Sequence, residues 1–411
     1  MKIQRCKGMR DLSPGEMDVF LSVEAACREC FARWGYREVR TPAIEYLHLF
    51  TSAGTLTSGQ LGKVYSFLDW DSWSGERVVL RPDGTIPVAR LYTDSLAGQT
   101  ARLSYATNIF MFEETGEHPR ERWQCGVELI GTGSAVADAE LVALSLDTLK
   151  KLGFKNVELR LSHAGLIMGL LEKLGLNPEE QHKVFDRILD GDAEALAEVG
   201  KKSPELESAL KPLIKLKGQS TGFLKNQPAM LPPGMEDIKP YLDDFLKTVA
   251  VLDELGINYR INIASGAGFE YYTGLIFQLF IGGEKVGGGG RYDALISAMG
   301  GGDVPAAGFA LYIDRLMALV EPGTDSTDTG TETVLVRAGK DIPVKKAFQS
   351  AADLRQAGYA AAIDMERADA DTGRILEVTV SGFRLSGIEY PSINEVLKKL
   401  GGQSGRQDSA A

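Results

Sequence analysis

Apolar residues recur at helical spacing in two long stretches of the first 160 residues. The first stretch follows Ser13, which can cap a helix that begins at Pro14 and has Glu16 three positions after the cap. Its apolar positions continue until Gly35, a residue that commonly ends a helix. The second stretch covers residues 137–152. We therefore expect a long helix in each.

Other apolar runs are short and bounded by Gly, Pro or polar residues, as is typical of strands. Pro82-Asp83-Gly84 predicts a turn between one such strand and a helix that begins near Ile86. Many strands with few intervening helices predict an α+β fold, a mostly antiparallel sheet flanked by helices. The expected strands lie within residues 36–45, 77–81, 102–114, 121–131, 258–265, 271–283 and 308–316.

The pattern of apolar residues changes twice after the first strands, and these changes predict how the chain is divided into domains. From about 166 to 255 apolar residues recur at helical spacing and strand signals are nearly absent, so we predict a helical insertion in a domain of residues 1–322. An acidic stretch rich in Gly, Ser and Thr predicts a linker at 323–332. Alternating strand and helix signals predict a small α/β domain over 333–400, and 401–411 reads as a disordered tail.

Composition narrows the functional classes. The net charge of −11 argues mildly against a large nucleic-acid interface, because phosphate contacts need clustered Lys and Arg. The first residues contain no apolar signal segment, and no run of about 18 apolar residues predicts a membrane span. The cysteines form no paired framework, so we expect a reducing, cytoplasmic location. Cys27 and Cys30 form a C-x-x-C on a helix without a second ligand pair, which favours core cysteines over a metal site.

Several short motifs are ambiguous when each is taken alone. Residues 287–293, GGGGRYD, fit either a phosphate-binding glycine loop or a flexible hairpin end. Gln124 and Glu128 share one face of a strand, where they either converge on a ligand amine or form a solvated face. RPDGT, which contains Asp83, fits a simple turn. The four histidines are scattered and show no metal-ligand spacing.

A glycine-lined segment, GAGFEYYTGLIFQ, carries adjacent tyrosines at 271 and 272 after Glu270. It has the character of a pocket wall for a small polar molecule. No basic residue lies between Arg260 and Lys285. The segment therefore predicts a binding wall without a cation for chemistry.

In their order and spacing these pieces resemble the histidyl-tRNA synthetase family over residues 1 to about 320. The resemblance implies a class II synthetase-like, six- or seven-stranded antiparallel sheet that forms a dimer through motif one. The last 80 or so residues resemble the family's anticodon-binding domain only loosely. The matching segments are GMRDLSP, WGYREVRTPAIE, LRPDGT, QCGVELIG, YYTGLIF, GGGGRYDALI and PAAGFALYIDRL.

The same resemblance implies a histidine pocket. The acid and threonine of the family's turn hold the α-amino group, the Gln and Glu of its Q-x-G-x-E segment hold the amine and the imidazole, and paired tyrosines line the imidazole slot. In this sequence Arg291 and Arg315 are candidates for supporting the pocket. The implied histidine-binding residues are Asp83, Thr85, Gln124, Glu128, Tyr271 and Tyr272.

Two departures from the family pattern affect catalysis. Met111 stands where the synthetase has a motif-two Arg, followed by Glu113 and Glu114, and Ala267 stands where it has a second catalytic Arg. Losing two such electrostatic stabilisers costs on the order of 10⁴–10⁶ in rate. We therefore assign no catalytic residue, cofactor or metal, and expect a pocket without adenylate chemistry.

A synthetase-like chain of this kind resembles the regulatory subunits of ATP phosphoribosyltransferase. That resemblance implies a short-form catalytic subunit as partner and L-histidine as feedback effector. We expect no tRNA or membrane partner. Many regulatory subunits of this type lack a C-terminal domain, and we interpret the small one in this chain as an interaction or dimer-support element. Two alternatives stay open. One is a divergent histidyl-tRNA synthetase, against which Met111 and Ala267 argue, and the other is a different histidine-binding paralogue.

Overall fold

A computed structural model describes two compact units of the chain, Met1–Thr324 and Asp325–Ala411, and each has its own hydrophobic core. The division lies within the stretch predicted as a linker. The described residues are 4–52, 61–70, 75–112, 119–172, 236–261, 271–320, 333–364 and 374–404, with five single positions at 177, 180, 181, 184 and 187.

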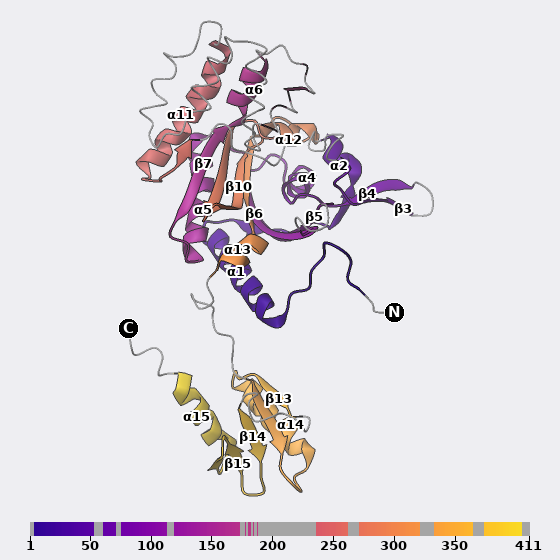
Figure 1. The fold of residues 1–411 in the computed structure, drawn as a ribbon, viewed down its shortest axis with the longest axis vertical. Coiled ribbons are helices and arrows are strands. Elements are labelled where there is room, and N and C mark those ends of the chain that lie inside the picture. Colours follow the sequence, from indigo (N-terminus) through magenta and orange to yellow (C-terminus); the bar gives the residue numbers. More distant parts are fainter. Residues whose placement is uncertain are drawn as a thin grey trace. The chain divides into compact units, whose positions relative to one another are not determined.

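The first unit is built on a sheet of eight described strands in the order β1-β5-β6-β11-β10-β9-β7-β8 (Figure 1). The six central strands are antiparallel, as the sequence predicts, whereas β1 and β8 at the edges pair in parallel with β5 and β7. The predicted, mostly antiparallel sheet is confirmed, and the two parallel edge pairs make it a mixed sheet. The strands are β1 Arg37–Glu38, β5 Ala101–Phe110, β6 Glu121–Ile130, β7 Val157–His163, β8 Arg260–Ile261, β9 Leu275–Ile281, β10 Glu284–Arg291 and β11 Ala306–Tyr312.

The parallel edges have a topological cause. A parallel pair needs a crossover connection, usually helical, because the chain must return to the same end of the sheet. Helices α6 (Ala164–Glu172) and α11 (Lys239–Glu254) lie between β7 and β8 in the chain and belong to such a connection. They are the described parts of the predicted helical insertion. Most of its remaining residues lie outside the described part of the chain.

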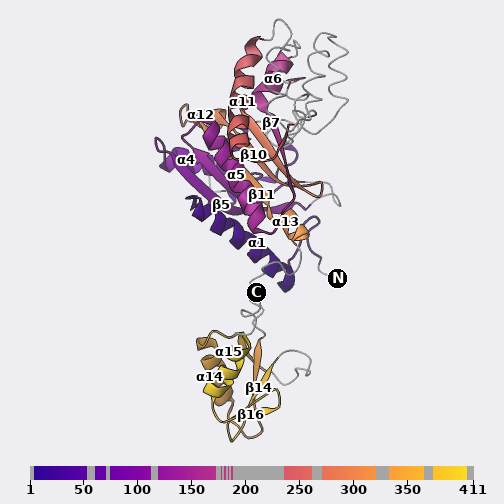
Figure 2. The same ribbon diagram turned by 90° about the vertical axis from the view of Figure 1, so that its left-hand side faces the viewer.

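Long helices cover one face of the sheet. Helix α1 (Pro14–Arg33) begins with the predicted capping box, since the Ser13 hydroxyl accepts from Glu16 N and the Glu16 carboxylate accepts from Ser13 N. Helix α5 (Ala135–Lys151) packs beside α1 and α11 (Figure 2). Together with α13 (Ile313–Leu319) they bury a core that includes both cysteines of the C-x-x-C pair. No group of His, Cys, Asp and Glu among the described residues has metal-ligating geometry.

Side-chain alternation along the strands separates this core from a second layer. On β6 the odd-numbered Cys125, Val127 and Leu129 belong to the core under α1 and α5. The opposite face meets α4 (Thr85–Ser95), α12 (Asp293–Ala298) and a small sheet (Figure 1). That sheet has the order β2-β4-β3, with β2 Ile44–Tyr46, β3 Ser66–Asp69, β4 Glu76–Leu80 and the short helix α2 (Leu47–Ser52) beside it.

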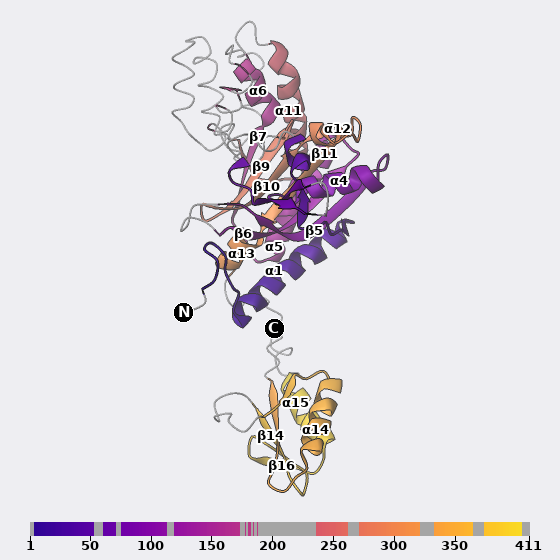
Figure 3. The ribbon, with the colours of Figure 1, turned by 90° about the vertical axis from the view of Figure 1, so that its right-hand side faces the viewer.

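Three sequence-based expectations need correction in this unit. The strand expected to end at Pro42 comprises only Arg37–Glu38, and residues 44–46 form a separate strand in the small sheet. The strand expected over 308–316 ends at Tyr312, where α13 begins. The GGGGRYD segment forms neither a phosphate loop nor a hairpin end, because its four glycines belong to β10, between β9 and β11 in the sheet (Figure 3).

The second unit is a small α/β domain with a five-stranded sheet in the order β13-β12-β14-β15-β16. The predicted disordered tail begins too early, because α15 continues to Ser404. No described helix is long and apolar enough to cross a membrane. The elements are β12 Val334–Ala338, α14 Val344–Gln356, β13 Ala361–Ile363, β14 Ile375–Val378, β15 Phe383–Leu385, β16 Ile388–Tyr390 and α15 Ile393–Ser404.

Candidate ligand-binding site

A pocket opens on the face of the large sheet opposite α1 and α5. Its floor is a row of small residues in register across three strands, where Gly288 of β10 pairs with Ala310 of β11 and Ala310 pairs with Gly126 of β6. At one end of this row Gly288 pairs with Gln278 of β9. The cavity has a volume of about 40 Å³, several times what one buried water needs.

The missing side chains of the floor keep the pocket open. A Cβ atom on Gly126 would lie 2.4 Å from the Tyr105 ring, and one on Gly290 would lie 2.9 Å from the Tyr272 ring. A Cβ atom on Gly308 would meet the Glu128 carboxylate. The glycines of β10 and β11 therefore allow aromatic and acidic side chains to lie directly on the sheet. This close packing accounts for the glycine-rich sequence, and no phosphate-binding role is needed.

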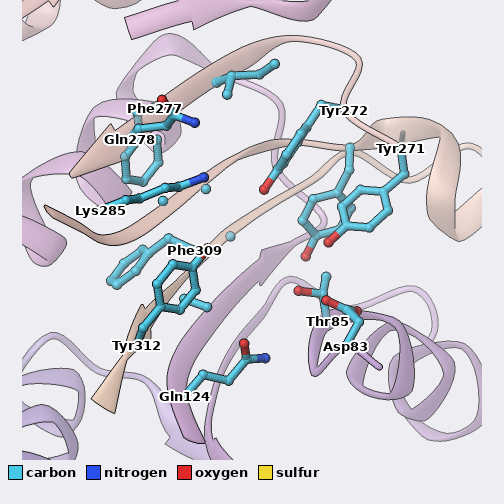
Figure 4. A pocket seen from close by; sticks show the side chains of 16 residues that line it. Asp83, Thr85, Gln124, Tyr271, Tyr272, Phe277, Gln278, Lys285, Phe309 and Tyr312 are labelled. Carbon is cyan, nitrogen blue, oxygen red and sulfur yellow. The ribbon is translucent and has the colours of Figure 1, made fainter. Parts of the chain in front are cut away.

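Asp83 and Thr85 form one wall of the pocket (Figure 4). Asp83 precedes α4, and its carboxylate accepts a hydrogen bond of 2.8 Å from Ile86 N. The turn itself is held by buried Arg81, whose guanidinium donates to the carbonyl oxygens of Thr41, Pro42 and Asn108 at 2.8–2.9 Å. Arg81 thus fixes the position of the acid that follows it.

Burial raises the pKa of Asp83 to about 6, although backbone N–H groups of the α4 start partly offset this effect. Glu128 is fully buried and its pKa is raised to about 8, mainly by burial. The Tyr292 hydroxyl donates a hydrogen bond to its Oε2. At neutral pH Glu128 is mostly protonated, so it can donate to a neutral acceptor or, after losing its proton, accept from a cation.

Tyr271 and Tyr272 lie just before β9 and line the cavity, with Tyr271 next to Asp83 and Thr85 (Figure 4). Their ring centroids are 5.2 Å apart, and Tyr271 packs edge-on against Tyr292 at 5.5 Å. Burial and the nearby carboxylates raise the pKa of both phenols well above the usual value, so both stay neutral. They provide aromatic walls with hydroxyl groups, which suits a flat polar ring.

The structure brings the six predicted site residues to one place. Asp83, Thr85, Gln124, Tyr271 and Tyr272 line the cavity. Glu128 lies behind it, where it contacts Tyr292. The buried amide nitrogen of Gln124 has no hydrogen-bond partner among the described residues. A ligand acceptor would satisfy it, because buried donors are almost always paired.

The two candidate supporting arginines do not line the cavity. Arg291 is buried and pairs with Asp138 at 2.6 Å and with Asp293 at 3.0 Å. Its carbonyl accepts from Thr273 N at 2.8 Å, so it holds the segment that follows Tyr272. Arg315 of α13 forms an ion pair with Glu284 at the start of β10.

Met111 occupies one of the two positions where the family has a catalytic arginine. It lies just after β5, and its N–H donates to Arg120 O at 2.9 Å. The Arg120 guanidinium stacks on Phe112, 4.1 Å from the ring centre. Neither Met111 nor Arg120 lines the cavity. Ala267 and Glu270 lie outside the described residues.

Several lining residues were not predicted as site residues. Tyr292 of the GGGGRYD segment and Phe309 of the GFALYIDRL segment both line the cavity. Gln278, Lys285 and Tyr312 line the end of the cavity away from Asp83 (Figure 4). In the sequence, Lys285 is the first basic residue after Arg260. This position was the signal that could have identified it as a pocket residue.

Comparisons with known proteins agree with this architecture. The family model described as histidyl-tRNA synthetase matches residues 8–316. An ATP phosphoribosyltransferase regulatory subunit from Dehalococcoides mccartyi is 53% identical over 360 residues, which cover 87% of each chain. A histidine–tRNA ligase from Archaeoglobus fulgidus is 33% identical, with 96% of this chain and 92% of the ligase covered.

A solved structure extends the likeness to three dimensions. The crystal structure titled an ATP phosphoribosyltransferase regulatory subunit/histidyl-tRNA synthetase, from Bacillus halodurans, superimposes with a TM-score of 0.74 at 26% identity. It covers 90% of this chain, and 94% of its own chain is covered. The fold, the family model and the relatives agree, and the chain belongs to the histidyl-tRNA synthetase family, in the branch of the ATP phosphoribosyltransferase regulatory subunits.

Proposed function

We propose that this chain is a non-catalytic regulatory subunit that binds L-histidine and activates a short-form ATP phosphoribosyltransferase catalytic subunit. Histidine would shift the complex toward a less active state, as the end product of the pathway. An allosteric coupling of about 1–3 kcal/mol suffices for a 5–150-fold effect. The partner follows from the names of the relatives at 53% identity.

The arrangement of the pocket carries the histidine assignment. Asp83 is an acid for the ligand's ammonium group, and Tyr271 and Tyr272 are aromatic walls for its ring. Glu128 lies deeper, with a raised pKa that lets it serve either protonation state of an imidazole. Such a combination of an acid, hydrogen-bonding groups and aromatic walls fits a small zwitterion with a flat polar ring.

The non-catalytic part of the proposal rests on the missing cations. Adenylate formation requires charge stabilisation at a polyphosphate. Lys285 is the one Lys or Arg among the residues that line the described cavity, and the position after Phe110 is occupied by Met111. The family resemblance further supports the proposal that the chain forms a dimer through its motif-one segment, and we also propose that it binds no tRNA.

The first experiment measures phosphoribosyl transfer to ATP by the cognate catalytic subunit, with and without this chain, across a histidine titration. We expect activity to rise on mixing and to fall as histidine is added. A parallel assay of histidine-dependent ATP–pyrophosphate exchange should show no activity above background.

Each possible result has a clear meaning. No change on mixing would contradict the regulatory assignment and leave a different amino-acid-binding paralogue. Activation that histidine does not reverse would contradict the effector assignment alone. Pyrophosphate exchange above background would instead identify a divergent synthetase.

A further inference from the structure

We propose that Lys285 binds the carboxylate of the amino-acid ligand and so selects for an intact α-amino acid in this pocket. The inference rests on the proposed histidine-binding function and adds a residue that the family motifs do not contain. The pairing of β10 with β9 is irregular next to this residue.

A bulge turns Lys285 toward the pocket. Further along β10, Gly287 and Gly289 face the helix-covered core, because Cβ atoms there would meet Leu311 and Phe309. Strict alternation would send Lys285 to that same core face. The register shifts between Lys285 and Gly287, however, and buried Val286 joins the core instead.

The bulge therefore has a functional consequence. An extra residue in one strand re-aims the neighbouring side chain. Here it brings a half-buried lysine to the cavity, beside Gln278 and Tyr312. Figure 4 shows the Lys285 side chain extending into the cavity from the side opposite Asp83 and Thr85.

Charge distribution supports the same assignment. The end of the cavity opposite Lys285 carries Asp83. A free amino acid needs an anion for its ammonium and a cation for its carboxylate, and the two ends of this pocket offer that pair.

A solvated lysine at the pocket mouth is the competing account. It would raise the affinity for any anion slightly and would not distinguish ligands by their α-carboxylate. L-Histidine and histamine make this distinction measurable, because histamine has the same ring and amine but no carboxylate.

The test is calorimetric titration of L-histidine and histamine into the full-length chain and its Lys285→Met variant. We expect the wild type to prefer histidine. Lys285→Met should weaken histidine binding by about 10- to 100-fold, the value of a charge-assisted hydrogen bond, and should leave histamine binding nearly unchanged. Lys285→Arg should retain most of the preference.

Lys150→Met is the matched control, because Lys150 is exposed on α5 and does not line the cavity. It should bind both ligands as the wild type does. Unchanged histidine affinity in Lys285→Met would overturn the assignment, and so would an equal loss for both ligands, which would indicate a damaged pocket. A wild-type chain that binds no histidine would instead refute the proposed function itself.

Discussion

The Tyr292 hydroxyl donates a hydrogen bond to the buried carboxyl group of Glu128. The two residues are 164 positions apart in the sequence, on the segment after β10 and on β6. Their contact places an acid with a raised pKa behind the aromatic wall of the pocket. Burying this acid costs folding free energy, and the cost depends on pH.

Glu128→Gln should therefore stabilise the protein at alkaline pH. The pKa of Glu128 rises from 4.5 to about 8 on folding, so the folded state holds a proton that the unfolded state releases between these values. The free energy of unfolding thus falls as pH rises through this window, by about 5 kcal/mol at most. Glutamine cannot ionise and keeps a side-chain acceptor for Tyr292.

Urea unfolding at pH 5 and pH 8 measures this effect. The advantage of Glu128→Gln over the wild type should be about 2–4 kcal/mol larger at pH 8 than at pH 5. An advantage that does not grow with pH would show that Glu128 has an ordinary pKa in the folded protein.

Asp83→Asn separates ligand binding from folding. Asparagine can still accept from Ile86 N and carries no charge that burial would penalise, so the variant should be at least as stable as the wild type at neutral pH. The loss of the negative charge should weaken histidine binding by about 10- to 100-fold. Calorimetry for affinity and thermal unfolding for stability check the two parts, and unchanged affinity would remove Asp83 from the amine site.

Tyr272→Ala should weaken feedback inhibition while the complex with the catalytic subunit still assembles. The substitution removes one aromatic wall of the cavity, in the segment just before β9. The inhibition constant for histidine and the elution volume of the mixed subunits give the two readouts. Inhibition identical to that of the wild type would contradict the pocket assignment.

Gly308→Ala should destabilise the first unit and block the pocket. Its Cβ atom would lie 2.5 Å from the backbone oxygen of Val127 and would also collide with the Glu128 carboxylate. Overpacking of this kind costs about 1–3 kcal/mol. Gly15→Ala is the control, because nothing lies within 4 Å of that Cβ position and a helical alanine stabilises by up to about 1 kcal/mol.

Urea unfolding measures the stability of both glycine variants, and histidine titration measures whether the pocket of each still binds its ligand. If Gly308→Ala is as stable as the wild type and binds histidine normally, the close packing of β11 on β6 is not what keeps the pocket open.

Asp138→Ala should be far more disruptive than removing a surface ion pair. Asp138 and Arg291 are both buried, and loss of the acid would leave a buried guanidinium with only Asp293 as a charged partner in the described contacts. Breaking a buried pair costs about 3–5 kcal/mol, whereas exposed pairs contribute about 0–1 kcal/mol. Arg5→Ala, which removes the exposed pair with Asp11, serves as the comparison in chemical unfolding.

Local sequence determined the elements whose signals are local. The Ser13 capping box and Pro14 define the start of α1, because a helix terminus is satisfied by side chains within one turn. Alternation along β6 put Gln124 and Glu128 on one face, and the family's motif order indicated which other residues share their pocket.

Tertiary structure decided what depends on strand register and connection. The parallel edges β1 and β8 follow from crossovers, and Gly288 of β10 becomes part of the pocket floor only because β9 and β11 flank that strand. The bulge before Gly287 brings Lys285 to the pocket, where no sequence periodicity placed it. A register shift of one residue exchanges the two faces of a strand, so which side chain reaches a ligand is a property of the assembled sheet.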